Sequence, residues 1–222
     1  RYDFYRELAH EIGANKVAVG QTQDDQAETV LLHLIRGAGL RGIAGIRPKR
    51  RMSSVWVIRP LLQVTRRETE ACTAAFGLTP RHDPYNIDQA YLRNRIRYRL
   101  LPWLRDEVNP NIKGVLAQSA AIWQEEDLYL ERAAEQAGQK LMKVTGSKVI
   151  VAIDQLDSLP LALKRRVVRL AFSKTVGDRR NLNFEHTESL LALGAAAVGT
   201  VIHLPRRVKA WRTYDEIVLA VG

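Results

Sequence analysis

The segment VAVGQTQDDQAETVLL, residues 17–32, joins a short apolar run to a helical pattern. The run KVAVG at residues 16–20 does not alternate between apolar and polar, which predicts a strand buried on both faces, as in a parallel sheet. Apolar residues then recur at helical spacing before a glycine that can end the helix: Ala27, Val30, Leu31, Leu34, Ile35 and then Gly37. A second amphipathic pattern precedes the strand at residues 2–12. Helix, buried strand and helix in this order predict part of a doubly wound α/β fold, with the chain beginning inside the sheet.

Three carboxylates follow the strand within one helical turn, at Asp24, Asp25 and Glu28. A plain helix cap, Thr22-x-x-Asp25, would account for one of them. It does not account for all three, because like charges this close repel each other. Ligands of open α/β sheets lie beyond the carboxyl ends of the strands, which is where this turn falls. The cluster therefore predicts a site for a cationic ligand, either an amine or Mg²⁺.

The chain of 222 residues is basic, with 34 Lys and Arg against 24 Asp and Glu, a net charge of +10. This excess favours nucleic acid as a partner over a basic protein without one. A single cysteine excludes a disulfide framework and a CxxC metal site. Apolar runs are too short to span a bilayer and no signal peptide is visible, so we expect a cytoplasmic protein without a membrane partner.

Basic residues gather in two segments. Between positions 36 and 67 the sequence has basic side chains and no Asp or Glu, a pattern that favours phosphate contacts. The glycines at 37, 39 and 42 match GxGxxG, but they follow a helix, so this is not a dinucleotide fingerprint. In RNRIRYR, residues 93–99, the arginines form two i, i+4 columns, Arg93 with Arg97 and Arg95 with Arg99. Adjacent like charges destabilise a helix, so we expect anions beside both columns.

A domain boundary is predicted at Asn109-Pro-Asn, which divides the chain into 1–108 and 109–222. The second part begins with a long helical pattern over residues 112–143 and ends in a small β-meander. Arg206 and Arg207 precede Trp211 on a segment predicted to be an edge strand. Cations next to an aromatic side chain can bind RNA, and this role stays open here.

Four ordered segments, DDQAETVLL, RGAGLRGIAG, RPLL and YLRNRIRYRLLP, resemble the tRNA(Ile)-lysidine synthase family, whose next domain is similar to the second part of this chain. The resemblance implies a PP-loop ATP-pyrophosphatase-type ligase. Such an enzyme adenylates C2 of cytidine 34 in the CAU anticodon of tRNA(Ile), and the ε-amine of free lysine then displaces AMP to give lysidine.

The resemblance also implies site residues. Asp24, Asp25 and Glu28 would be catalytic, and Asp25 and Glu28 with Arg93 and Arg97 would bind lysine. ATP, with Mg²⁺, would lie near Asp24 and the glycine loop that begins at Arg36, Gly37 and Gly39; the metal ligands stay unassigned. The arginines expected to contact RNA are Arg41, Arg50, Arg51, Arg95, Arg99, Arg206 and Arg207. We expect Asp25 and Glu28 to hold the α-ammonium of lysine, because a carboxylate beside the ε-amine would make that amine a poorer nucleophile.

Two departures from the family pattern bear on activity. Gln21 and Thr22 stand where the family usually has a His pair, and the family's Ser-Gly-Gly-x-Asp-Ser nucleotide loop is absent, since the chain has no Gly-Gly dipeptide. We therefore expect a chain that lacks its N-terminal portion and, alone, binds RNA without catalysis. A non-catalytic RNA-binding module is the alternative; a PP-loop thiolase is disfavoured by the single cysteine. The oligomeric state stays open, a homodimer included.

Overall fold

The computed structural model describes residues 2–79, 90–177 and 182–222. The chain divides into two compact units, Arg1–Asp127 and Leu128–Gly222. The helix α7 (Ile112–Leu141) contributes residues to both units. In the described part of the chain, no helix is both long enough and apolar enough to cross a membrane.

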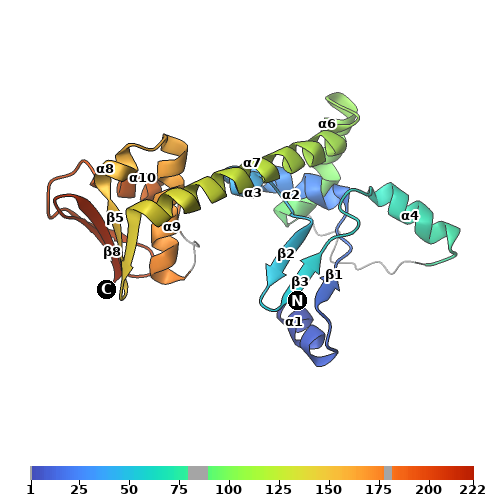
Figure 1. Cartoon of the computed structure of the whole chain (residues 1–222). Coiled ribbons are helices and arrows are strands. Elements are labelled where there is room, and N and C mark those ends of the chain that lie inside the picture. Colours follow the sequence, from blue (N-terminus) through green and yellow to red (C-terminus); the bar gives the residue numbers. More distant parts are fainter. Residues whose placement is uncertain (1, 80–89, 178–181) are drawn as a thin grey trace. The chain divides into compact units, whose positions relative to one another are not determined.

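The first unit contains a three-stranded mixed sheet in the order β1 (Lys16–Ala18), β3 (Val55–Ile58) and β2 (Lys49–Met52). The strands β1 and β3 are parallel, with Val17 opposite Val57, and β2 pairs antiparallel with β3 (Figure 1). This parallel pairing confirms the predicted α/β class. The predicted burial of β1 on both faces is wrong: Lys16 and Ala18 are exposed, and in the described sheet β1 pairs on one side only.

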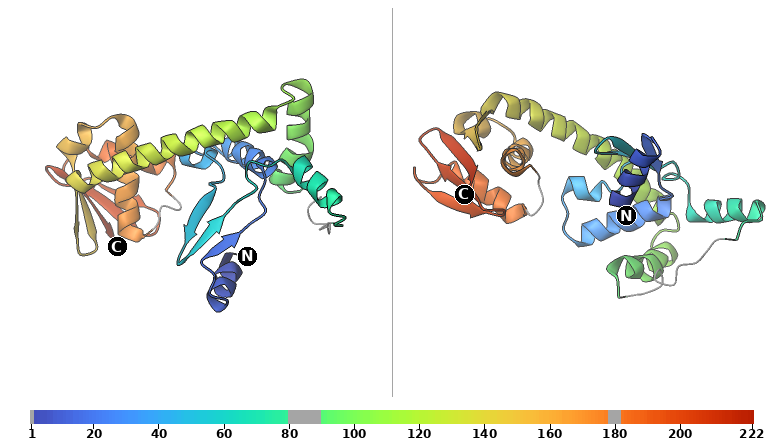
Figure 2. Two further views of the ribbon diagram at one scale, coloured as in Figure 1. Left: turned by 45° about the vertical axis from the view of Figure 1, so that its right-hand side comes forward. Right: turned by 90° about the horizontal axis from the view of Figure 1, so that it is seen from below.

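The helices of this unit lie before, between and after the strands along the chain. They are α1 (Tyr2–Glu11), α2 (Gln23–Ile35), α3 (Leu40–Ile43), α4 (Arg66–Ala75), α5 (Leu92–Arg95), η2 (Ile96–Leu100) and α6 (Leu101–Glu107). Gly37 follows α2 with a φ of +70°, a backbone conformation that glycine adopts without strain. A capping box begins α4, with Glu68 accepting from the backbone N–H of Thr65 at 2.7 Å. Helix α4 has no buried residue and projects from the sheet (Figure 2).

The glycine loop expected after Arg36 contains the short helix α3, and β2 follows it. Strand β2 carries three of the basic residues of positions 36–67, at 49, 50 and 51. It forms an edge of the sheet, where charged residues discourage pairing with another chain. Lys49 and Arg51 lie over the ring of Trp56 on β3, at 5.9 and 5.5 Å from its centroid. These cation–π contacts allow a strand rich in like charge to pair with its neighbour.

Pro102 does not break the helix around it. Residues 92–107 continue through a π segment, in which the Leu101 N–H donates to the carbonyl of Ile96, five residues earlier. The wider turn comes immediately before a residue that has no N–H to donate, so the helix passes the proline without a break.

The core of the first unit packs α2 against this helix. Ala27 and Leu31 of α2 meet Ile96 and Leu101, all 8% exposed or less. Leu104, and Ile112 and Leu116 at the start of α7, are partly buried against them. The contact brings the first turn of α2 beside the arginines of residues 93–99, which positions the candidate site.

The second unit is a five-stranded antiparallel sheet covered on one face by helices (Figures 1 and 2). Its strands run in the order β4 (Met142–Thr145), β5 (Lys148–Ala152), β8 (Glu216–Val221), β7 (Val208–Arg212) and β6 (Val201–Leu204). The helices are α8 (Ile153–Asp157), α9 (Leu161–Val176) and α10 (Phe184–Leu193). Phe172 and Leu190 are fully buried between the two layers. The meander is confirmed, but the strand of Trp211 is interior, with β6 on one side and β8 on the other.

Candidate functional site

Asp25 caps the helix that carries it. Its Oδ2 accepts from the backbone N–H of Thr22 at 2.9 Å and from the Thr22 hydroxyl at 3.2 Å. The capping interpretation is therefore right for one oxygen of one carboxylate. The other oxygen, Oδ1, faces two guanidinium groups.

Glu28 lies one turn further along α2 and is 2% exposed. It accepts from Arg93 Nε at 3.0 Å, from Arg97 Nε at 2.5 Å and from Arg97 Nη2 at 2.8 Å. Asp25 Oδ1 completes the group, at 3.1 Å from Arg93 Nη2 and 3.4 Å from Arg97 Nη2. We call Asp25, Glu28, Arg93 and Arg97 the ion cluster. It balances two negative charges against two positive ones, and it joins α2 to the helix of residues 92–107.

The charges in the ion cluster reinforce each other. The hydrogen bonds that Arg97 donates to Glu28 raise the pKa of Arg97 above its ordinary value; burial opposes this, and the charges of Glu28 and Asp25 add to it. Side-chain exposure falls from 39% at Arg93 through 24% at Arg97 and 23% at Asp25 to 2% at Glu28. A ligand can therefore reach Arg93, Arg97 and Asp25 more readily than Glu28.

Asp24 points away from the ion cluster. Its Oδ2 accepts from the backbone N–H of Arg66 at 2.7 Å, and its Oδ1 pairs with the ammonium of Lys113. Burial raises the pKa of Asp24, but the Lys113 bond and the Arg66 N–H outweigh it and hold this pKa below its ordinary value. The carboxylate lies at a polar pocket of about 400 Å³ that Arg66, Arg67, Arg105 and Lys113 help to line.

The residues expected near ATP begin at the opposite end of α2. Arg36 is its C-cap, and the helix places it about 18 Å from Asp24 at 1.5 Å per residue. Gly37 and Gly39 leave open space: a Cβ added at either would meet nothing within 4 Å. The end of the same loop returns to the first turns of α2, since the Ile46 N–H donates to Gln26 Oε1 at 2.6 Å. A Cβ at Gly45 would lie 2.7 Å from that oxygen, so close packing requires this glycine.

The arginines expected to contact RNA are all exposed, and they lie on several elements of the two units. Arg41 lies on α3, and Arg50 and Arg51 on β2, where Arg50 covers the ring of Tyr2 at 4.9 Å. Arg95 and Arg99 share a helix with the ion cluster but line a separate groove. Arg206 and Arg207 belong to the second unit, in the turn between β6 and β7, with φ of 61° and 59°.

Sequence reasoning missed two partners of this region. Lys113 lies beyond the predicted boundary at 109, yet it neutralises Asp24 within the first unit. Gln21 accepts from Arg59, which is 8% exposed and also donates to the Arg47 carbonyl at 2.8 Å. Both contacts join residues far apart in sequence, so no local pattern indicates them.

Residues 1–104 match the PP-loop domain model. This match places the first part of the chain in the PP-loop family. It is 35% identical over 219 residues to the tRNA(Ile)-lysidine synthase of Caldanaerobacter subterraneus subsp. tengcongensis, covering 99% of this chain and 46% of the relative. The synthase of Geobacter sulfurreducens is 36% identical, with 99% and 46% coverage, and that of Geobacillus kaustophilus is 37% identical, with 97% and 47%.

These matches confirm the resemblance expected from the four ordered segments and from the second part of the chain. The chain spans about half the length of the curated relatives that it matches. The ion cluster and Asp24 both lie within the PP-loop match. Among the described residues, no group of three or more His, Cys, Asp or Glu side chains could hold a metal ion. Asp24, Asp25 and Glu28 each pair with a basic side chain.

We expect Glu28→Gln to lower the free energy of unfolding of the chain by about 3 kcal/mol, because it leaves two partly buried guanidinium groups without their main anion. Urea denaturation would measure this. Arg95→Gln removes a charge from an exposed position on the same helix and serves as the control, with little expected change. A loss for Glu28→Gln no larger than the control would show that the ion cluster does not hold the PP-loop domain together.

Asp24 gives a pH-dependent prediction. Because its pKa is lowered in the folded chain, its contribution to stability is present above the unfolded value of about 3.9 and disappears as pH falls through the folded value. Asp24→Asn should therefore cost about 2 kcal/mol at pH 7 and progressively less below about pH 4. Thermal unfolding at several pH values would measure the difference, with Asp154→Asn at an exposed position of the second unit as control. A cost that does not change with pH would contradict the assignment.

Proposed function

We propose that this chain is the lysine-binding and tRNA-binding part of an enzyme that ligates lysine to tRNA(Ile). The reaction is ATP-dependent attachment of free lysine to C2 of cytidine 34 in the CAU anticodon. Two facts support it: the similarity to tRNA(Ile)-lysidine synthases over nearly the whole chain, and an ion cluster inside the PP-loop match. The cluster is the observation that carries the proposal.

The ion cluster suits the two charged groups of an amino acid. A free α-amino acid carries an ammonium and a carboxylate on the same carbon atom, and the cluster presents a carboxylate next to two guanidinium groups. Guanidinium groups bind carboxylates through paired, charge-assisted hydrogen bonds. We assign the α-carboxylate of lysine to Arg93 and Arg97, whose side chains keep exposed surface.

We assign the α-ammonium of lysine to Asp25. The 3.4 Å contact between Arg97 Nη2 and Asp25 Oδ1 is the longest in the ion cluster, so it is the one that a ligand displaces most readily. Glu28 is nearly inaccessible and already accepts three bonds, so its part is to hold the two guanidinium groups in place. This differs from the sequence-based expectation, in which Glu28 itself contacts the ammonium.

The proposed geometry leaves the ε-amine of lysine away from the carboxylates. Its nitrogen must lose a proton to attack, and a neighbouring carboxylate would instead stabilise the charged form. In the proposed step a bond forms between that nitrogen and C2 of the cytidine. The bond from C2 to the adenylate oxygen breaks, AMP leaves, and the proton of the amine passes to solvent.

ATP would supply the adenylate, and Arg36, Gly37 and Gly39 are the proposed contacts. The open space at both glycines fits close approach by a ligand. The described residues offer no Mg²⁺ cluster, so no step is assigned to that ion. The chain has no Gly-Gly dipeptide, so we propose catalysis for a protein that also includes the family's nucleotide loop, and binding alone for this chain.

A non-catalytic RNA-binding module is the second candidate. It is favoured by one observation: Asp24, Asp25 and Glu28 each already have a basic partner within the chain. Such a module would bind tRNA through its exposed arginines and would have no affinity for lysine. Lysine binding therefore distinguishes the two functions.

The test combines one substitution with one altered ligand. We expect Asp25→Asn to weaken lysine binding about ten-fold, the loss of one charged hydrogen bond. The analogue 6-aminohexanoate keeps the ε-amine and the carboxylate but lacks the α-amine, so Asp25→Asn should leave its weaker binding unchanged. Calorimetry on the 222-residue chain would measure both ligands.

Asp106→Asn is the matched control, since it removes a carboxylate that pairs with its neighbour Arg105 outside the ion cluster. An equal loss for both ligands would contradict the assignment of the α-ammonium to Asp25. Absence of lysine binding with tRNA binding intact would favour the RNA-binding module.

A further inference from the structure

The helix of residues 92–107 carries two columns of arginine with different surroundings. Arg93 and Arg97 are matched by Asp25 and Glu28. Arg95 and Arg99 are exposed, and neither forms an ion pair within residues 2–79, 90–177 and 182–222. Like charges at this spacing cost helix stability unless an anion compensates them. One column has its anions inside the protein, and the second lacks one in the described chain.

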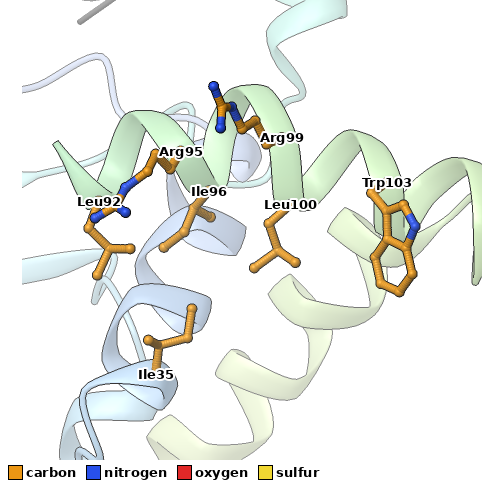
Figure 3. Close-up of a pocket in the computed structure, with 7 residues that line it drawn as sticks. All are labelled: Ile35, Leu92, Arg95, Ile96, Arg99, Leu100 and Trp103. Atoms are coloured by element: carbon orange, nitrogen blue, oxygen red, sulfur yellow. The ribbon is translucent and has the colours of Figure 1, made fainter. Parts of the chain in front are cut away.

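The second column borders an apolar groove of about 390 Å³, within the size range of ligand pockets. Its lining is Ile35, Leu92, Arg95, Ile96, Arg99, Leu100 and Trp103. In Figure 3 the aliphatic side chains of Leu92, Ile96 and Leu100 project from the same side of the helix. Ile35 belongs to the neighbouring helix α2, and Trp103 lies further along the helix of residues 92–107. None of these lining residues is acidic.

The groove exposes large apolar side chains. Trp103 is 56% exposed and Ile35 is 53% exposed. An occupant must therefore offer an apolar surface to the groove and negative charge to the two guanidinium groups beside it. A nucleotide has both features, since a base has apolar faces and its phosphate is an anion. A duplex does not expose its base faces, because its bases are stacked.

We propose that this groove receives an unpaired base of a bound RNA, with the base against Trp103 and Leu100 and the adjoining phosphates at Arg95 and Arg99. The inference rests on the proposed function, in which the partner is tRNA, and it assigns a second contact point separate from the ion cluster. Aromatic side chains bind unpaired bases by stacking, and arginines follow the backbone.

The experiment measures binding of a labelled single-stranded RNA of about eight nucleotides to the 222-residue chain by fluorescence anisotropy. The same strand carrying abasic sites keeps the phosphates and lacks the bases. We expect Trp103→Ala to weaken binding of the intact strand roughly ten-fold and to leave the abasic strand unaffected. Trp103→Phe keeps an aromatic ring and should retain most of the affinity, which separates stacking from a loss of folding.

The arginines give an independent readout. Replacing Arg95 and Arg99 together by Gln should weaken both strands and reduce the slope of log affinity against log salt by about 1.4, the value for two phosphate contacts to a single strand. Arg105→Gln is the matched control on the same helix, outside the groove and paired with Asp106. It should reduce the slope less.

Several outcomes would overturn the inference. One is an equal effect of Trp103→Ala on the intact and the abasic strand. Another is that the variants at Trp103, Arg95 and Arg99 bind RNA no more weakly than Arg105→Gln does. A third is displacement of the RNA by ATP alone, which would make a free nucleotide the occupant. A lower sedimentation mass for Trp103→Ala would make the occupant a second copy of the chain. If the unaltered chain binds neither the strand nor tRNA, the proposed function fails with it. If the chain binds RNA and the variants bind it with the same affinity, only this inference fails.

Discussion

A carboxylate that is 2% exposed cannot remain charged inside a protein unless cations and hydrogen bonds replace the water it has lost, and Glu28 is in this position. Arg93 and Arg97 supply three such bonds from a helix 65 to 69 residues further along the chain. The requirement fixes α2 against that helix in one register, with Ala27 and Ile96 in the core beneath. The positions of Asp25, of both arginine columns and of the apolar groove all follow from this pairing.

The same pairing explains why one basic helix can bear the two proposed functions. Its inward column is neutralised within the chain, so the ion cluster carries no net charge and suits a ligand that carries both signs. Its second column keeps an uncompensated positive field beside apolar side chains, which suits a polyanion with exposed bases. The π segment at residues 96–100 lets the helix continue past Pro102. Trp103 therefore lines the same groove as Leu92 and Leu100.

Local patterns in the sequence predicted much of this arrangement. Apolar spacing located α1, α2 and α7, and the three carboxylates at the start of α2 marked the site region. The i, i+4 spacing of Arg93 and Arg97 indicated that they share a side of their helix. What anion they meet depends on tertiary packing, as do the Lys113 partner of Asp24 and the Arg59 partner of Gln21. The basic strand β2 was missed because its cations lie over aromatic rings supplied by other elements.

The central claim is that the ion cluster, and not the second arginine column, seats the amino acid. Nuclear magnetic resonance of the arginine Nε–H groups during a lysine titration tests it most directly, because the two columns report from the same helix. The account predicts saturable shifts of the Arg93 and Arg97 signals, while those of Arg95 and Arg99 stay in place. Shifts confined to Arg95 and Arg99, or none in Arg93 and Arg97 at saturating lysine, would contradict it.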